Sequence, residues 1–156
     1  MADSIQEQII KKVSDVMAAI TVANGYNNTI EVVQRLRATG VSTARVPTIV
    51  IYEGDCAVDL PNSTHQRVRR KLELYLVAVT GQEETDAAPS GAELLNSLIA
   101  DMELAVGENE RWDGLALMTD PPDYQEWELD AVDPHLARGL RTVITYEHER
   151  GDPWGA

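Results

Sequence analysis

Few residues in this 156-residue chain have the type and spacing that catalysis or metal binding requires. Of the three histidines, only His148 has acidic neighbours, Glu147 and Glu149. Adjacent residues of a strand point to opposite faces of a sheet, so these three side chains are not expected to converge on a metal ion. Cys56, the single cysteine, has no adjacent basic residue to activate a thiolate. Because the glycines match neither a phosphate-binding loop nor a dinucleotide fingerprint, we expect no cofactor and no enzymatic activity.

The densest positive charge in the chain lies between residues 67 and 71. We call this group the basic cluster: Arg67, Arg69, Arg70 and Lys71. One interpretation is a solvated strand end, because surface charges contribute little to stability. The other is a contact surface that pairs with acidic residues of an adjacent subunit or of another protein, such as those at 83, 84 and 86.

The C-terminal tail, residues 150–156, combines features that suit a contact with another protein. Gly151 permits a sharp change of direction, Asp152 can accept backbone hydrogen bonds, and Pro153 fixes the chain. Trp154 offers a large apolar contact at low entropic cost. The alternative interpretation is a frayed terminus. We predict that the tail docks on a neighbouring subunit or on a protein above it.

The chain is strongly acidic, with 26 Asp and Glu against 13 Lys and Arg and a net charge of −13. Such a charge argues against binding to the phosphate backbone of nucleic acid as the main activity. Three interpretations of the negative charge remain. The first is that it serves only to keep the protein soluble, and the second is that it lines a channel through which DNA passes without binding. The third is that it imitates the charge of DNA toward a DNA-binding protein.

Length and composition predict one domain covering residues 1–156. The hydrophobic fraction of 44% and the charged fraction of 25% are typical of a soluble globular protein. No apolar run approaches the roughly 20 residues that span a bilayer, so no membrane association is expected. The N-terminus has neither a basic start nor an apolar signal core, which predicts synthesis in the cytoplasm.

Hydrophobic periodicity predicts the elements that position these residues. A capping box at residues 4–7 precedes apolar residues at helical spacing up to residue 20, and a second box at 90–93 precedes an apolar stripe from 95 to 106. Strands are predicted at 29–37, 46–52, 67–80, 114–119, 125–129 and 139–149. We expect residues 53–55 to close the second strand as a turn, and residues 56–66 to be irregular.

The strand at 67–80 is expected to be central, because its second half is apolar on both faces. Two helices of about four turns can cover only one face of the sheet. The expected fold is therefore α+β, a mixed, largely antiparallel sheet of five or six strands with two amphipathic helices on one face. The other face requires cover from loops or from a neighbouring subunit. Trp112 and Trp127 are expected to fill the core or to anchor loops.

Three stretches resemble small bacteriophage tail proteins. Residues 20–27, with the sequence Ile-Thr-Val-Ala-Asn-Gly-Tyr-Asn, are similar to the junction that follows the first helix in these proteins. The apolar strand at 46–50 and the closing segment, which runs from residue 142 through Tyr146 to the Gly-Asp-Pro at 151–153, resemble those of the tail terminator (tail completion) family. The order of helices and strands agrees over nearly the whole chain. The segment 121–134 and Trp154 have no counterpart in this resemblance.

The resemblance implies a structural virion protein that forms a hexameric ring on the tail tube, ends tube polymerisation and joins the tail to the head. Its partners would be further copies of the chain, the tail tube protein and a head–tail connector or stopper protein, with DNA passing through the lumen without specific binding. The ring would lie at the head-proximal end of the virion tail after assembly in the host cytoplasm. Expected interface residues are the basic cluster, Tyr146 and residues 151–154. The alternative function is an acidic DNA mimic that inhibits a host DNA-binding protein.

Overall fold

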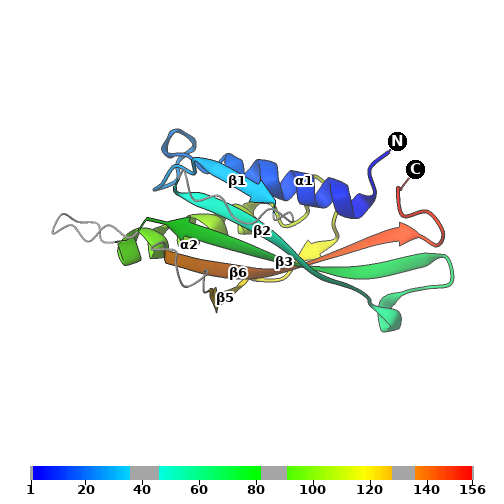
Figure 1. Cartoon of the computed structure of the whole chain (residues 1–156). Helices are drawn as coiled ribbons and strands as arrows, with labels where there is room; N and C mark the ends of the chain where they lie inside the picture. Colours follow the sequence, from blue (N-terminus) through cyan, green and yellow to red (C-terminus); the bar gives the residue numbers. More distant parts are fainter. Residues whose placement is uncertain (1, 36–45, 82–90, 128–135, 156) are drawn as a thin grey trace.

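A six-stranded sheet with two helices on one face forms the protein, as a computed structural model shows (Figure 1). The structure describes residues 2–35, 46–81, 91–127 and 136–155. The order along the chain is α1, β1, β2, β3, α2, β4, β5 and β6. This confirms the predicted α+β class and the predicted order of one helix, three strands, one helix and three strands.

The sheet is mixed but mostly antiparallel. The bounds are α1 Ile5–Ala18, β1 Val32–Arg35, β2 Thr48–Val58, β3 Arg67–Thr80, α2 Gly91–Glu108, β4 Met118–Thr119, β5 Asp123–Glu126 and β6 Leu136–Glu149, with 3-10 helices at Val22–Asn24 (η1) and Leu60–Asn62 (η2). The strand order is β1-β2-β3-β6-β4, and β5 also pairs with β6. The β1–β2 pair is parallel and the other pairs are antiparallel.

The central position predicted for residues 67–80 is confirmed. β3 has the predicted bounds, and β2 and β6 pair with it on its two sides. Its first residue is exposed, whereas its last five residues are buried. The strand therefore runs from solvent into a layer that is covered on both faces.

The second strand is longer than predicted. β2 continues through Glu53, Gly54 and Asp55 to Val58, because β3 offers pairing partners along this whole length. Glu53 pairs with Leu74 and Cys56 with Leu72, so β2 has one residue more than β3 between these pairs, and this residue forms a bulge. The prediction of a turn at 53–55 is therefore wrong. The segment 56–66, which was expected to be irregular, contains the last residues of β2 and the whole of η2.

Other strand boundaries also differ from the predictions. The strand expected at 114–119 is shorter in the structure and covers Met118–Thr119. The first strand, expected at 29–37, begins later and is described as Val32–Arg35. Residues 36–37 and 128–129 of two predicted strands lie outside the described residues, as does the first residue of the second capping box. At the start of α1, the Ser4 hydroxyl accepts a hydrogen bond from the Glu7 amide at 3.2 Å, as the capping box predicts.

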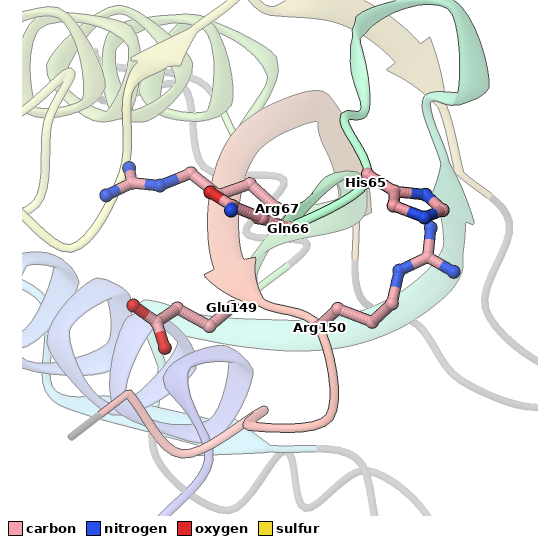
Figure 2. Close-up of a pocket in the computed structure, with 5 residues that line it drawn as sticks. All are labelled: His65, Gln66, Arg67, Glu149 and Arg150. Carbon is pink, nitrogen blue, oxygen red and sulfur yellow. The ribbon is translucent and has the colours of Figure 1, made fainter.

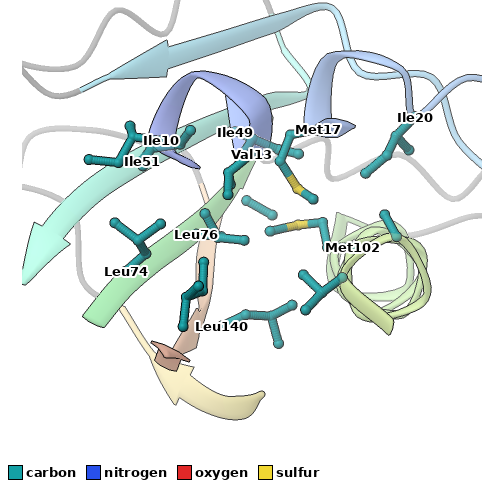
Figure 3. Close-up of a cluster of buried hydrophobic side chains, with 14 of the residues drawn as sticks. Ile10, Val13, Met17, Ile20, Ile49, Ile51, Leu74, Leu76, Met102 and Leu140 are labelled. Carbon is teal, nitrogen blue, oxygen red and sulfur yellow. The ribbon is translucent and has the colours of Figure 1, made fainter. Parts of the chain in front are cut away.

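The main core lies between the helices and one face of the sheet. Figure 3 shows Met17 of α1 and Met102 of α2 pointing toward each other, close to Ile49 and Leu76 of the sheet. The Trp112 side chain, 0% exposed, belongs to the same cluster, and its indole nitrogen donates to the Thr119 hydroxyl at 2.9 Å. The core role expected for Trp112 is confirmed.

The opposite face of the sheet has a smaller apolar cluster. Its buried members are Val50, Val77 and Val79. The Trp127 ring packs beside them, 4.7 Å from the ring of Tyr52 and 5.6 Å from that of Tyr75, measured between centroids. Trp127 thus anchors the end of β5 against this face, in agreement with its expected role.

A buried carboxylate holds the junction that follows α1. Asp101 of α2 is 2% exposed. One carboxylate oxygen accepts from the backbone and side-chain amides of Asn27, at 3.2 and 3.3 Å, and the other accepts from those of Asn28, at 2.9 and 2.7 Å. Asn27, the last residue of the stretch that resembles tail proteins, and Asn28 after it therefore have a structural role within the chain.

Candidate subunit interface

The candidate interface lies where β2, β3 and β6 reach one end of the molecule. Figure 1 shows the β2–β3 connection and the end of β6 at this end, and the start of α2 at the other. We call this region the arm end and define it as residues 56–71 and 145–150. It contains the basic cluster, and the C-terminal tail follows directly from it.

The structure divides the basic cluster between the two faces of β3. Side chains alternate along a strand, so Arg67, Arg69 and Lys71 lie on the face opposite the helices, whereas Arg70 lies on the helix face with Leu72. The basic cluster is therefore not one continuous surface. The acidic residues at 83, 84 and 86, proposed as its partners, lie outside the described residues.

The cluster is paired with groups of its own chain. Arg69 lies directly opposite Glu147 on β6, and its guanidinium contacts one oxygen of that carboxylate at 2.6 and 2.9 Å. Arg67 approaches the other oxygen at 3.5 Å, and Lys71 lies 3.9 Å from a carboxylate oxygen of Asp59. A partner protein would therefore meet charges that are already paired, which favours the interpretation of these three residues as a partly solvated strand end.

Ion pairing continues along the same face toward the centre of the sheet. The Arg141 guanidinium donates to one oxygen of Glu73 at 2.6 Å, and the Tyr75 hydroxyl donates to the other at 2.5 Å. The Tyr75 hydrogen bond and the Arg141 charge lower the pKa of Glu73. This carboxylate is therefore charged at neutral pH, and the face presents cross-strand charged pairs to its surroundings.

We predict that Arg69→Glu will lower the free energy of unfolding by about 1 kcal/mol, because like charges would then face each other across β3 and β6. The double variant Arg69→Glu/Glu147→Arg is expected to recover most of this loss, since it restores an opposite-charge pair in the same register. Chemical denaturation of the isolated chain measures both values. Equal stability of the single and double variants would show that the pair does not contribute.

Tyr146 packs inside the chain instead of on its surface. It is 3% exposed and belongs to the main core on the helix face. Its hydroxyl lies 3.4 Å from the sulfur of Cys56, and burial raises the pKa of Tyr146. The sulfur contact raises it further. The phenol is therefore neutral at physiological pH, and its side chain is not available to a partner in this conformation.

The tail docks on the first turn of α1 in its own chain. The Asp152 carboxylate accepts from the amides of Trp154 and Gly155, at 3.2 and 3.3 Å, after Gly151 turns the backbone with a φ of 85°. The Pro153 carbonyl accepts from the Ile5 amide at 3.0 Å. That amide belongs to the first turn of a helix, where backbone N–H groups have no partner within the helix. The tail is thus held in place, and this does not fit the interpretation as a frayed terminus.

Apolar side chains remain exposed at this end of the molecule, and Leu60 and Trp154 are the most exposed of them. Trp154 is 50% exposed although the backbone around it is fixed. Leu60 in η2, at the β2–β3 connection, is 76% exposed, the highest value among the large apolar side chains of the described residues. Sequence reasoning missed Leu60, because residues 56–66 were expected to be irregular; the only local signal is an apolar residue within the polar Asp-Leu-Pro-Asn stretch.

A polar recess of about 470 Å³ lies between the start of β3 and the end of β6. Figure 2 shows Arg67 and Glu149 extending toward one side of it, and His65 and Arg150 toward the other. The Arg150 amide donates to the Gln66 carbonyl at 2.8 Å, which joins the two chain segments that form the recess.

The residues that the structure describes offer neither a metal-binding cluster nor a membrane-spanning helix. Within them, no group of three or more His, Cys, Asp and Glu side chains is placed to hold a metal ion. In the same parts of the chain, no helix has the length and apolar character needed to cross a membrane. No protein-family model matches this chain, and no curated protein matches its sequence.

Proposed function

We propose that this chain is a structural virion protein, which forms a ring on the tail tube, ends tube polymerisation and joins the tail to the head connector. The observation that carries the proposal is that Leu60 and Trp154 are exposed. They belong to the β2–β3 connection and to the C-terminal tail, two segments that lie at the same end of the sheet in Figure 1. Exposed aromatic and aliphatic residues on a fixed backbone are suited to protein contacts. The sequence resemblance to tail terminators supports the same function.

A closed ring requires that one surface of each subunit contacts a different surface of the next. The arm end is suited to be one of these surfaces, because it lies at one extremity of the molecule and because Arg69 and Lys71 pair with acidic residues of the same chain. Its apolar residues can then be buried without leaving these two charges unpaired. We propose six subunits per ring on the basis of the resemblance.

The net charge of −13 supports a lumen through which DNA passes without specific binding. Phosphates are repelled by a wall of carboxylates, so the DNA would not adhere during passage. The proposed partners are the tail tube protein on one side of the ring and a connector or stopper protein on the other. In this role the chain is not an enzyme.

We expect the purified chain to form hexamers when tail tube protein is present. Such rings need a template when contacts between subunits are weak, so the chain alone is expected to sediment as a monomer at low concentration. Sedimentation velocity with and without tail tubes measures both states, and a reconstruction of the virion locates the ring. A monomer that decorates the virion away from the tail axis would contradict the proposal.

The alternative function is a DNA mimic that inhibits a host DNA-binding protein, and the net charge favours it equally. A mimic needs a negative face that replaces the phosphate backbone and should bind a basic partner as a monomer or dimer. The arginines at the arm end disfavour this role for that surface. Salt-sensitive, one-to-one binding to a basic protein, with no assembly on tail tubes, would support the mimic.

A further inference from the structure

A second recess, of about 230 Å³, lies where the end of α2 meets the turn between β4 and β5. We call it the edge recess, because β4 is the last strand on this side of the sheet. Its apolar lining comes from Val106 of α2 and from Pro121 and Pro122 of the turn. Sites for small molecules are larger, about 300–1,000 Å³, so the edge recess suits a single side chain of a protein.

A glycine in α2 keeps the edge recess open. Gly107 lines it and is the second to last residue of the helix. Apart from the neighbouring backbone of α2, a Cβ at this position would have no described atom within 4 Å, and the φ of Gly107 is not positive. Glycine is less favourable than alanine in a helix. Contacts within the described chain do not require it here, whereas the close approach of another molecule does.

The rim of the edge recess is acidic. It consists of Glu103 and Glu110 of α2, which are exposed, and Asp120 of the turn, which is half-buried. The described residues that line the recess include no lysine and no arginine. A segment that enters this recess is therefore expected to be apolar at its tip and positively charged around it.

The arm end has both properties. It contains five Lys and Arg against three Asp and Glu, although the whole chain has a net charge of −13. Internal ion pairs leave this positive excess in place, because the carboxylates are fewer, and Arg150 is exposed. Leu60, 76% exposed, lies in the β2–β3 connection, which extends beyond both helices in Figure 1.

We propose that the edge recess receives Leu60 of a second copy of this chain. The arm end and the edge recess have no residue in common, so each copy inserts its arm end into the next copy and receives that of the previous one. Such a contact joins different surfaces of the two copies and generates a ring when the rotation closes. The inference rests on the proposed function, for which it names the second surface of the subunit contact.

Two variants, each with one of the two surfaces disabled, test the contact. Leu60→Asp disables the arm end, and Gly107→Trp fills the edge recess without weakening α2, because tryptophan is a better helix former than glycine. In ¹H–¹⁵N spectra of labelled Leu60→Asp, the amide resonances of Gly107 and Thr119 should shift when unlabelled Gly107→Trp is added. Adding unlabelled Leu60→Asp should cause no shift. Unchanged resonances with the first, or equal shifts with both, would overturn the proposal.

Further variants of the added chain measure what Leu60 contributes. Gly107→Trp/Leu60→Ala should bind about 10- to 100-fold more weakly, as expected for the loss of one buried leucine side chain. Gly107→Trp/Val22→Asp is the matched control, because Val22 is 61% exposed in η1, outside both surfaces, and it should bind as Gly107→Trp does. The unchanged chain replaces Gly107→Trp as the added partner if that variant does not fold.

The contact and the proposed function fail in different ways. If the unchanged chain forms rings on tail tubes but the amide resonances of Gly107 and Thr119 do not shift in the mixture, the edge recess is not the contact and the proposed function stands. If these resonances shift but no ring forms on tail tubes, the contact between copies stands and the proposed function is contradicted.

Discussion

Replacing Asp101 with alanine is expected to lower the free energy of unfolding by about 3 kcal/mol, because four partly buried N–H groups then lose an acceptor that is itself buried. The carboxylate accepts four hydrogen bonds from Asn27 and Asn28 and is 2% exposed, so water has little access to replace it. A buried amide without a partner costs about 1–3 kcal/mol. Asn27 is exposed and Asn28 is half-buried, so water and rearrangement of the two asparagines recover part of the total. Chemical denaturation of the isolated chain measures the loss.

Two further variants control for the loss of charge and for the helix position. Asp101→Asn keeps one acceptor oxygen but directs an NH₂ group at the amides of Asn27 or Asn28, so an intermediate loss is expected. Glu103→Gln, two residues further along α2, changes an exposed residue and keeps an oxygen that can accept from the Tyr124 hydroxyl, so it should change stability by no more than about 0.5 kcal/mol. A loss below about 1 kcal/mol for Asp101→Ala would show that the junction after α1 finds other partners.

Local sequence signals were sufficient for the helices and for the central strand. The hydroxyl of Ser4 and the apolar spacing after it determine where α1 begins and which face is buried. β3 was predicted with its observed bounds because its strand-like pattern continues without interruption, and its central position was predicted because its second half is apolar on both faces. In contrast, the turn signal at Glu53-Gly54-Asp55 was misleading. Pairing of β2 with β3 continues past these residues, and tertiary pairing outweighs the local preference of a glycine for turns.

The candidate interface was predicted less completely, because its contacts join distant parts of the chain. Arg69 and Glu147 are 78 positions apart, and nothing near either residue indicates the pair. The tail was predicted to be ordered, but its contact with Ile5 is visible only once both ends of the chain are placed. Leu60 was missed for a related reason, since its exposure depends on how η2 lies beyond β2 and β3.

Within the proposed function, Trp154→Ala is expected to weaken attachment of tails to heads by about 30-fold, which corresponds to about 2 kcal/mol of binding free energy. The indole is half exposed while Asp152 and Pro153 fix the backbone that carries it, so it can be buried in a partner at low entropic cost. The stability of the isolated chain should not change, because the side chain is largely outside the core. Joining of purified tails and heads in vitro, counted by electron microscopy, measures attachment.

Truncation after Arg150 separates the indole from the rest of the tail. Because this deletion also removes the hydrogen bond from the Ile5 amide to the Pro153 carbonyl, it should lower the stability of the isolated chain by about 1 kcal/mol in addition to weakening attachment. If Trp154→Ala joins tails to heads normally and only the truncated chain fails, the tail acts by supporting α1 and the indole is not a contact. If both variants join normally, the partner surface lies elsewhere, and Leu60 becomes the residue to test.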